Sequence, residues 1–92
     1  MEQPDRRQNL IGPTVRKLRM AAKLSQEALA ARLQVAGWDI TRGGLSKIES
    51  RIRRVNDAEI LVLATVLKCG LSDLYPKPNR KDVAQVLRQA RG

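Results

Sequence analysis

The sequence predicts an all-α fold: a compact body of five helices followed by a short extra C-terminal helix. Three observations support this prediction. Apolar residues recur at three- and four-residue spacing, which is the period of one helix face. An apolar residue followed by a polar residue able to cap a helix occurs three times, each time at the start of such a segment. The 92 residues suffice for one domain with a modest core.

The N-terminal part of the chain predicts a polar arm and then a first helix. Residues 1–9 are polar and are expected to form a flexible arm. The first helix is expected over residues 12–23, because a proline suits its first turn. Val15, Leu18 and Ala22 would share one face of this helix.

The second helix is expected to begin after Ser25, whose hydroxyl can cap it. Leu24 and Leu29 stand in the positions of a hydrophobic staple, and Leu33 continues the apolar stripe. Gly37 marks the following turn.

The third helix, residues 41–50, repeats this arrangement with Thr41 as the cap and Ile40 before it. Leu45 and Ile48 would face the core. Two adjacent glycines near a helix start cost roughly 1 kcal/mol each relative to Ala, which indicates a site where the backbone must approach something closely. The outer face would carry Arg42, Gly43, Ser46, Lys47 and Ser50.

A basic connection over residues 51–55 precedes the fourth helix, which Asn56 and Glu59 would start as a capping box. Gly70 is expected to end this helix, which is the most apolar one. This helix is expected to be the central one because of its apolar residues Ile60, Leu61, Leu63, Ala64 and Leu67.

Ser72 is expected to cap a short fifth helix that Pro76 stops. After a linker, residues 80–91 predict a final helix whose apolar face either packs on its own domain or forms a dimer. The chain thus divides into an arm (1–9), a main domain (10–76) and a linker with a helical tail (77–92). The apolar face of the tail comprises Val83, Val86, Leu87 and Ala90.

The charge of the chain predicts a polyanionic partner. Lys and Arg number 18 against 9 acidic residues, for a net charge of +9. Either nucleic acid or an acidic membrane surface would suit this balance. No apolar run approaches the ~18 residues that a membrane span needs, and the N-terminus does not look like a secretory signal.

Catalysis, cofactors and metals are not expected. The chain has no His and one cysteine, Cys69, so it offers no Cys/His nucleophile, no internal disulfide and no Cys-rich metal site. A reducing, cytoplasmic setting fits best. With only Trp38 and Tyr75 aromatic, a base-stacking surface for single strands is also disfavoured. Double-stranded DNA is the partner that remains.

Residues 24–50, LSQEALAARLQVAGWDITRGGLSKIES, resemble the helix-turn-helix of the lambda-repressor and Cro-like (Xre-type) family of DNA-binding regulators, and the resemblance extends over residues 10–76. It implies that the third helix enters the major groove with its N-terminal residues. It also implies that Arg19 and Glu49 bridge the first and third helices as a structural clamp.

The resemblance and the outer-face pattern together give a set of expected DNA contacts. Arg42 and Lys47 would read bases, with Gly43 beside them. Gln26 would hold a phosphate and brace the third helix, and the three arginines after that helix would lie beside the backbone. The full set is Gln26, Thr41, Arg42, Gly43, Gly44, Ser46, Lys47, Arg51, Arg53 and Arg54.

The chain departs from the family in the turn, because Thr41 follows Leu33 by eight positions. The segment QVAGWDI would either extend the second helix by a turn or form a loop under Trp38, whose ring is expected to pack on the core.

The expected function is sequence-specific binding of double-stranded DNA as a transcriptional repressor of bacterial or phage origin. Family members usually bind as two-fold dimers on inverted repeats, and a homodimer through the fifth helix and residues 80–91 is expected here. One alternative is an antitoxin that holds a toxin partner through the tail. The other is a protein-interaction module that has lost base readout, for which Gly43 and Gly44 argue and the net charge of +9 argues against.

Overall fold

The computed structural model describes residues 7–77 and 79–89, and within them the chain is helical with no strand. The prediction of an all-α fold is therefore confirmed. The elements are α1 (Gly12–Ala21), α2 (Gln26–Val35), α3 (Arg42–Glu49), α4 (Asp57–Leu67), the 3-10 helix η1 (Leu71–Leu74) and α5 (Arg80–Gln89).

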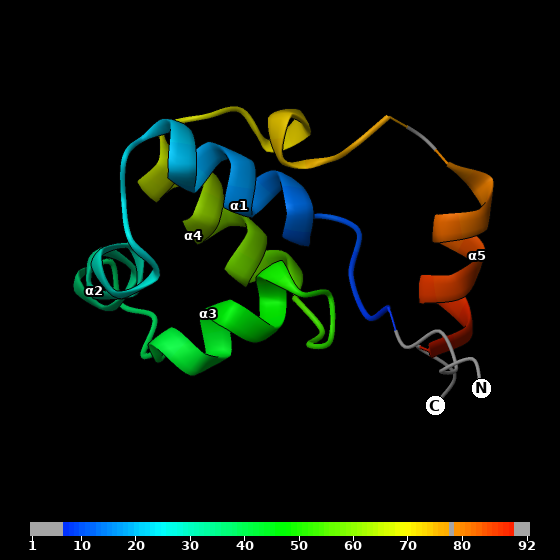
Figure 1. Cartoon of the computed structure of the whole chain (residues 1–92), viewed down its shortest axis with the longest axis horizontal. Helices are drawn as coiled ribbons and strands as arrows, with labels where there is room; N and C mark the ends of the chain where they lie inside the picture. The colour runs from blue at the N-terminus through cyan, green and yellow to red at the C-terminus, as the bar shows by residue number, and fades with distance from the viewer. Residues whose placement is uncertain (1–6, 78, 90–92) are drawn as a thin grey trace.

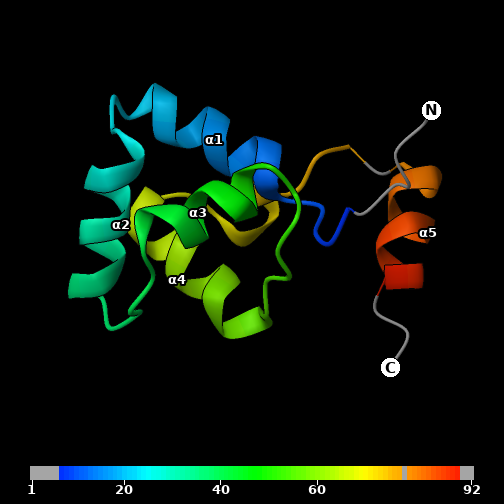
Figure 2. The ribbon, with the colours of Figure 1, turned by 60° about the horizontal axis from the view of Figure 1, so that its bottom comes forward.

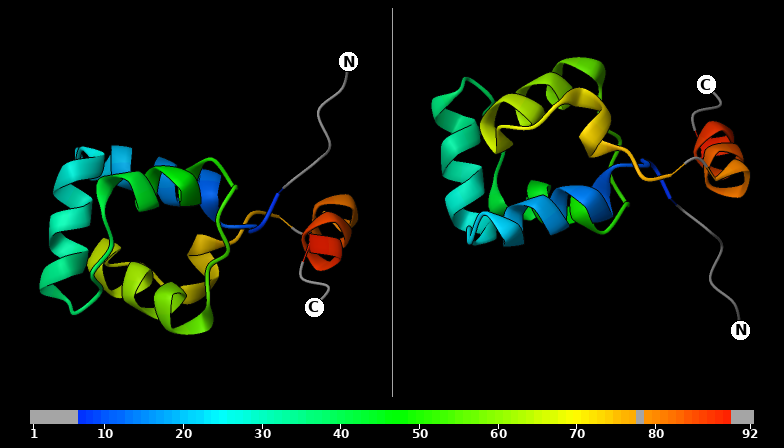
Figure 3. Two further views of the ribbon diagram at one scale, coloured as in Figure 1. Left: turned by 90° about the horizontal axis from the view of Figure 1, so that it is seen from below. Right: turned by 90° about the horizontal axis from the view of Figure 1, so that it is seen from above.

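Helices α1 to α4 and η1 form one body, and α5 stands apart from it (Figure 1). Within the body α1 packs against α3, α4 and η1, while α2 packs against α3 and α4. Views from other sides also show the ribbon of α5 beside the body, connected to it by the N-terminal segment and the linker (Figures 2 and 3). None of these helices is long and apolar enough to cross a membrane, for the residues that the structure describes.

The core lies where the apolar stripes of α1 to α4 meet, as the helical spacing predicts. Ala22, expected on the apolar face of the first helix, lies after the end of α1 and is exposed, and Leu61 of α4 is 56% exposed. Burial of each large side chain is worth about 1.5–3 kcal/mol. The buried apolar residues are Ile11, Val15, Leu29, Ala30, Leu33, Ile40, Leu45, Ile48, Leu63, Ala64 and Leu74.

Three predicted helix caps are confirmed. The Ser25 hydroxyl accepts a hydrogen bond from the Ala28 N–H at 3.0 Å, and the Thr41 hydroxyl accepts one from Gly44 at 3.1 Å. Asn56 and Glu59 form the expected capping box.

The predictions for η1 and for the end of α4 were wrong in detail. The Asp73 carboxylate, not Ser72, serves the start of η1 by accepting a hydrogen bond from the Gly70 N–H at 2.8 Å. Helix α4 ends at Leu67, because Lys68 takes the left-handed conformation (φ 56°) that Gly70 was expected to supply.

The lengthened turn is mainly a short loop, since α2 continues only to Val35, which is less than the extra helical turn that was one of the two expectations. Helix α2 continues to Val35, and Gly37 (φ 103°) then reverses the chain. The Gln34 side chain donates to the Ile40 carbonyl at 2.7 Å and closes the loop. Trp38 is half-buried and packs against the core, as expected.

Residue 9 belongs to the packed body, although the sequence suggested an arm up to that point. Asn9 is buried, and its side-chain oxygen accepts from the Gly12 N–H at 2.8 Å, which helps to start α1. Its amide donates to the Ile48 carbonyl at 3.1 Å and to the Arg53 carbonyl at 2.8 Å. Residues 1–6 of the expected arm lie outside the described residues.

Candidate nucleic-acid interface

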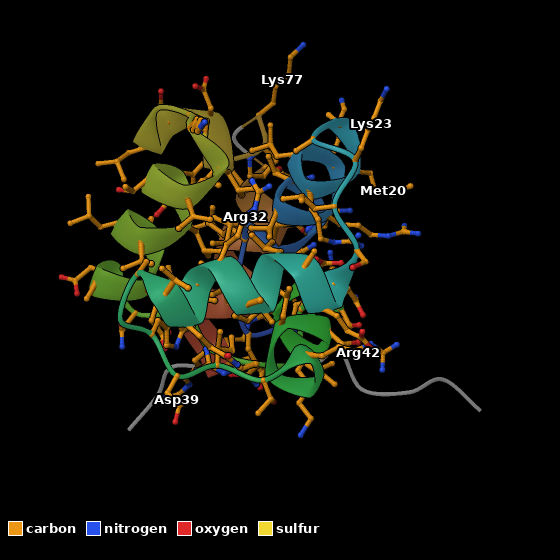
Figure 4. All side chains as sticks on the ribbon, turned by 90° about the vertical axis from the view of Figure 1, so that its left-hand side faces the viewer. Met20, Lys23, Arg32, Asp39, Arg42 and Lys77 are labelled. Atoms are coloured by element: carbon orange, nitrogen blue, oxygen red, sulfur yellow. The ribbon has the colours of Figure 1, made fainter. Side chains whose placement is uncertain are left out.

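Helix α3 has one face in the core and the opposite face open to solvent. Leu45 and Ile48 are fully buried, as their spacing predicts. Arg42, Gly43 and Lys47 are exposed on the other side. Figure 4 shows Arg42 extending away from the body near the start of α3. The structure therefore brings the predicted base-contacting residues together on one free helix face.

A buried ion pair fixes α3 to α1. Two hydrogen bonds join the Arg19 guanidinium to the Glu49 carboxylate, Nε to Oε2 at 2.8 Å and Nη2 to Oε1 at 3.0 Å. The side chains are only 10% and 3% exposed. Arg19 also donates to the Leu24 carbonyl at 2.7 Å. The bond to Glu49 raises the pKa of Arg19, against the opposing effect of burial.

Gln26 ties α2 into the same cluster. Its amide nitrogen donates to Glu49 Oε1 at 3.1 Å, so Glu49 receives hydrogen bonds from two other helices. An amide nitrogen carries two hydrogens, and the second remains available to an external acceptor such as a phosphate oxygen. The bracing role is visible, while the phosphate contact stays a prediction.

The two adjacent glycines of α3 have different surroundings. A Cβ on Gly44 would lie 3.1 Å from Ile40 Cγ1, so this glycine makes room for a side chain of its own domain. A Cβ on Gly43 would meet nothing closer than the Thr41 hydroxyl at 3.7 Å. Of the two glycines, only Gly43 has room for a side chain within the domain. The absence of a side chain at Gly43 therefore suits close approach of an external partner.

Arg51 does not lie on the free face of α3. Its side chain is 14% exposed, and its Nε donates to the Asn9 carbonyl at 2.9 Å. Its Nη1 lies 3.6 Å from the Asp82 carboxylate of α5. Arg51 therefore joins the end of α3 to the N-terminal segment and to α5.

Arg53 is also held within the domain. It donates to both carboxylate oxygens of Glu59 at 3.1 and 3.0 Å, and its guanidinium lies 5.7 Å from the centre of the Trp38 ring. Burial raises the pKa of Glu59, but the hydrogen bonds from Arg53 and from the Asn56 backbone outweigh it, and the net pKa is lowered.

Arg54 is exposed and turns toward α5. Its Nε donates to the Gln8 side chain at 3.3 Å, and its Nη2 donates to the Gln89 carbonyl. The three arginines after α3 thus diverge, and their expected phosphate contacts remain predictions.

Sequence reasoning missed Asn9 and Asp82, which join the segments around the end of α3. An available signal for Asn9 was its position three residues before Gly12, where side-chain oxygens commonly serve a helix start. Asp82 gave no such signal. Within the described ranges no group of His, Cys, Asp and Glu residues could hold a metal ion.

An exposed helix, anchored by buried polar contacts and joined through a loop to a second helix, defines the class of helix-turn-helix DNA-binding domains. A family model confirms this: residues 15–74 match the helix-turn-helix family of the lambda-repressor and Xre-like type, and the chain belongs to that family. The protein is accordingly a DNA-binding regulator. No curated protein and no solved structure matches it significantly.

Proposed function

We propose that the protein is a sequence-specific transcriptional repressor that inserts α3 into the major groove of double-stranded DNA. The observation that carries this proposal is the anchoring of α3: Glu49 is bound by Arg19 and Gln26, while the opposite face stays free. A reading helix must be held rigidly if it is to distinguish bases, because a small displacement breaks a bidentate hydrogen bond.

Arg42 and Lys47 are the base readers in this proposal. The guanidinium of Arg42 can donate two hydrogen bonds to the O6 and N7 atoms of a guanine, and Lys47 can donate as a point charge. Thr41, Gly44 and Ser46 lie beside them on or near the first turns of α3. The open space at Gly43 lets the backbone come close to the DNA.

Substitution of Arg42 by Ala should weaken binding to the preferred site by about 1–3 kcal/mol and leave non-specific binding nearly unchanged, because a base contact is lost. The preferred site comes from selection of bound duplexes from a random library at ~150 mM salt, where exposed charges are screened beyond ~8 Å.

The matched control is Arg32→Ala, since Arg32 is an exposed arginine on α2, away from Arg42 (Figure 4). An equal loss on all sequences for both variants would contradict base readout by Arg42. No enriched sequence for the natural chain would favour the alternative of an interaction module.

The repressor is further proposed to act as a homodimer on inverted repeats. Two surfaces support this. Helix α5 has no buried residue, and Val83 and Leu87 on its apolar face are 39% and 66% exposed. Beside η1, an open groove of about 610 Å³ is lined by Leu61, Leu71 and Tyr75 among others. Reciprocal contact between two copies would cover both surfaces.

Deletion of residues 79–92 should convert the dimer to a monomer. Operator binding should weaken, because each half-site is then bound by a separate monomer and not by one linked dimer. Molecular mass in solution and operator affinity measure this. Unchanged mass and affinity would exclude the dimer role of the tail. If instead the natural chain co-purifies with a small partner protein through this tail, the antitoxin alternative gains support.

A further inference from the structure

Helix α5 has a basic face distinct from its apolar face. Arg80, Lys81 and Arg88 are all exposed. Together with Arg7 they border a shallow hollow of about 420 Å³, to which Ala84 and Gln85 also contribute. This surface is not part of the helix-turn-helix.

Polar contacts hold α5 beside the body, where none of its side chains is fully buried and Val86 is half-buried. The Asp82 carboxylate lies against Arg7 and Arg51, and the Gln89 carbonyl accepts a hydrogen bond from Arg54. Arg51 and Arg54 follow α3 within five residues. Helix α5 is therefore held beside the C-terminal end of α3, at the side of the body opposite α2 (Figures 1 and 3).

Within the described residues these contacts place no acidic side chain in an ion pair with Arg80, Lys81 or Arg88. Asp82 is the one acidic residue between Arg80 and Gln89, and it is occupied by Arg7 and Arg51. In the part of the chain that the structure describes, Arg80, Lys81 and Arg88 form no ion pair. Three uncompensated cations along one helix face suit a polyanion with regularly spaced charges.

The position of α5 indicates which polyanion. The eight residues of α3 span about 12 Å, which equals the width of the major groove. A helix that enters the groove by its N-terminal residues therefore has its C-terminal end near the groove edge, where the phosphates lie. A basic helix held by the connection after that end would then lie near the phosphate backbone.

We propose that the basic face of α5 binds backbone phosphates next to the groove read by α3 and so extends the footprint of the protein. This inference rests on the proposed function. It assigns sequence-independent binding to Arg80, Lys81 and Arg88, whereas Arg51 and Arg53 are held by contacts within the domain.

The test is the triple variant Arg80→Gln, Lys81→Gln and Arg88→Gln. Each lost phosphate contact reduces the slope of log affinity against log salt by about 0.9, so the slope should fall by up to about 2.7. Between 50 and 200 mM salt the natural chain would then lose affinity by about 40-fold more than the variant. Sequence preference should not change, and the cleavage-protection footprint should shorten on one flank of each half-site.

The matched control is Arg32→Gln, Lys68→Gln and Lys77→Gln, which removes the same charge from exposed side chains on α2, the end of α4 and the linker. Figure 4 shows Arg32 and Lys77 away from Arg42. Circular dichroism and molecular mass in solution verify that both variants keep their fold and assembly.

Equal slopes for the two variants, or a slope of the α5 variant equal to that of the natural chain, would overturn the inference. Measurement on non-operator DNA separates it from the proposed function. A slope difference without any sequence selection would support the α5 contact and refute base readout by α3. Sequence selection without a slope difference would support base readout by α3 and refute the α5 contact.

Discussion

Replacement of Arg19 by Met is expected to lower the free energy of unfolding by about 3–5 kcal/mol. The loss arises because the Glu49 carboxylate, only 3% exposed, would remain in the core with a single hydrogen bond from Gln26. For a domain of this size such a change can exceed half of the total stability. Urea denaturation followed by circular dichroism measures it.

A double variant, Arg19→Met with Glu49→Leu, provides the control. With both charges removed, no buried ion is left without a partner, so the double variant should be more stable than Arg19→Met alone. A double variant less stable than the single one would contradict this account, because Glu49 would then stabilise the domain even without Arg19, for example through Gln26. The double variant should still bind DNA more weakly than the natural chain, because α3 loses the polar contacts that fix its position.

Local signals explain why so much of the fold could be predicted. The hydroxyls of Ser25 and Thr41 and the side chain of Asn56 bond to backbone groups three residues away. Contacts between residues so close in the sequence can be recognised from a short sequence pattern. The orientation of α3 was predictable in the same way, because Leu45 and Ile48 fall on one face at helical spacing.

The contacts that could not be predicted join residues far apart in the chain. Asn9 bonds to Ile48 and Arg53, and Arg51 lies against Asp82. No local sequence pattern identifies such pairs, because each polar side chain has several possible partners elsewhere in the chain. The Arg19–Glu49 bridge, equally distant in sequence, was expected only from the family resemblance.

This difference affects the interpretation of the basic residues after α3. Their number predicted a row of phosphate contacts, but tertiary contacts take Arg51 to Asn9 and Arg53 to Glu59. The net charge of +9 is unchanged by these pairings, but Arg51 and Arg53 are only partly exposed, whereas Arg80, Lys81 and Arg88 of α5 are exposed. Composition can therefore predict the class of partner, but it does not predict which Lys and Arg side chains contact that partner.

The tail illustrates the same limit. The apolar face of residues 80–91 was predicted from helical spacing, with Ala90 outside the described residues. Packing of that face on its own domain, one of the two interpretations, is partial: Val86 is half-buried and lines a hollow with Ile11 and Val55, while Leu87 is 66% exposed. The polar contacts of α5 reach residues more than 30 positions away, such as the one between Gln89 and Arg54.

Substitution of Gly12 by Ala is expected to destabilise the domain by about 3 kcal/mol, the upper end of the usual cost of overpacking. The Cβ of an alanine would lie 2.2 Å from the Ile48 carbonyl oxygen. Because the obstacle is backbone and not a flexible side chain, α1 and the end of α3 must move apart. That movement would also strain the hydrogen bond from Asn9 to the Ile48 carbonyl.

Gly43→Ala is the matched control, because it makes the same change in the first turn of another helix. Its Cβ would have ordinary contact distances, with the Thr41 hydroxyl at 3.7 Å, so alanine should stabilise the helix by about 0.5–1 kcal/mol. Urea midpoints should therefore shift in opposite directions for the two variants. Similar shifts would mean that α1 and α3 are not in close contact at Gly12. The position of α3 relative to α1 thus depends on a missing side chain at Gly12 as well as on the Arg19–Glu49 pair.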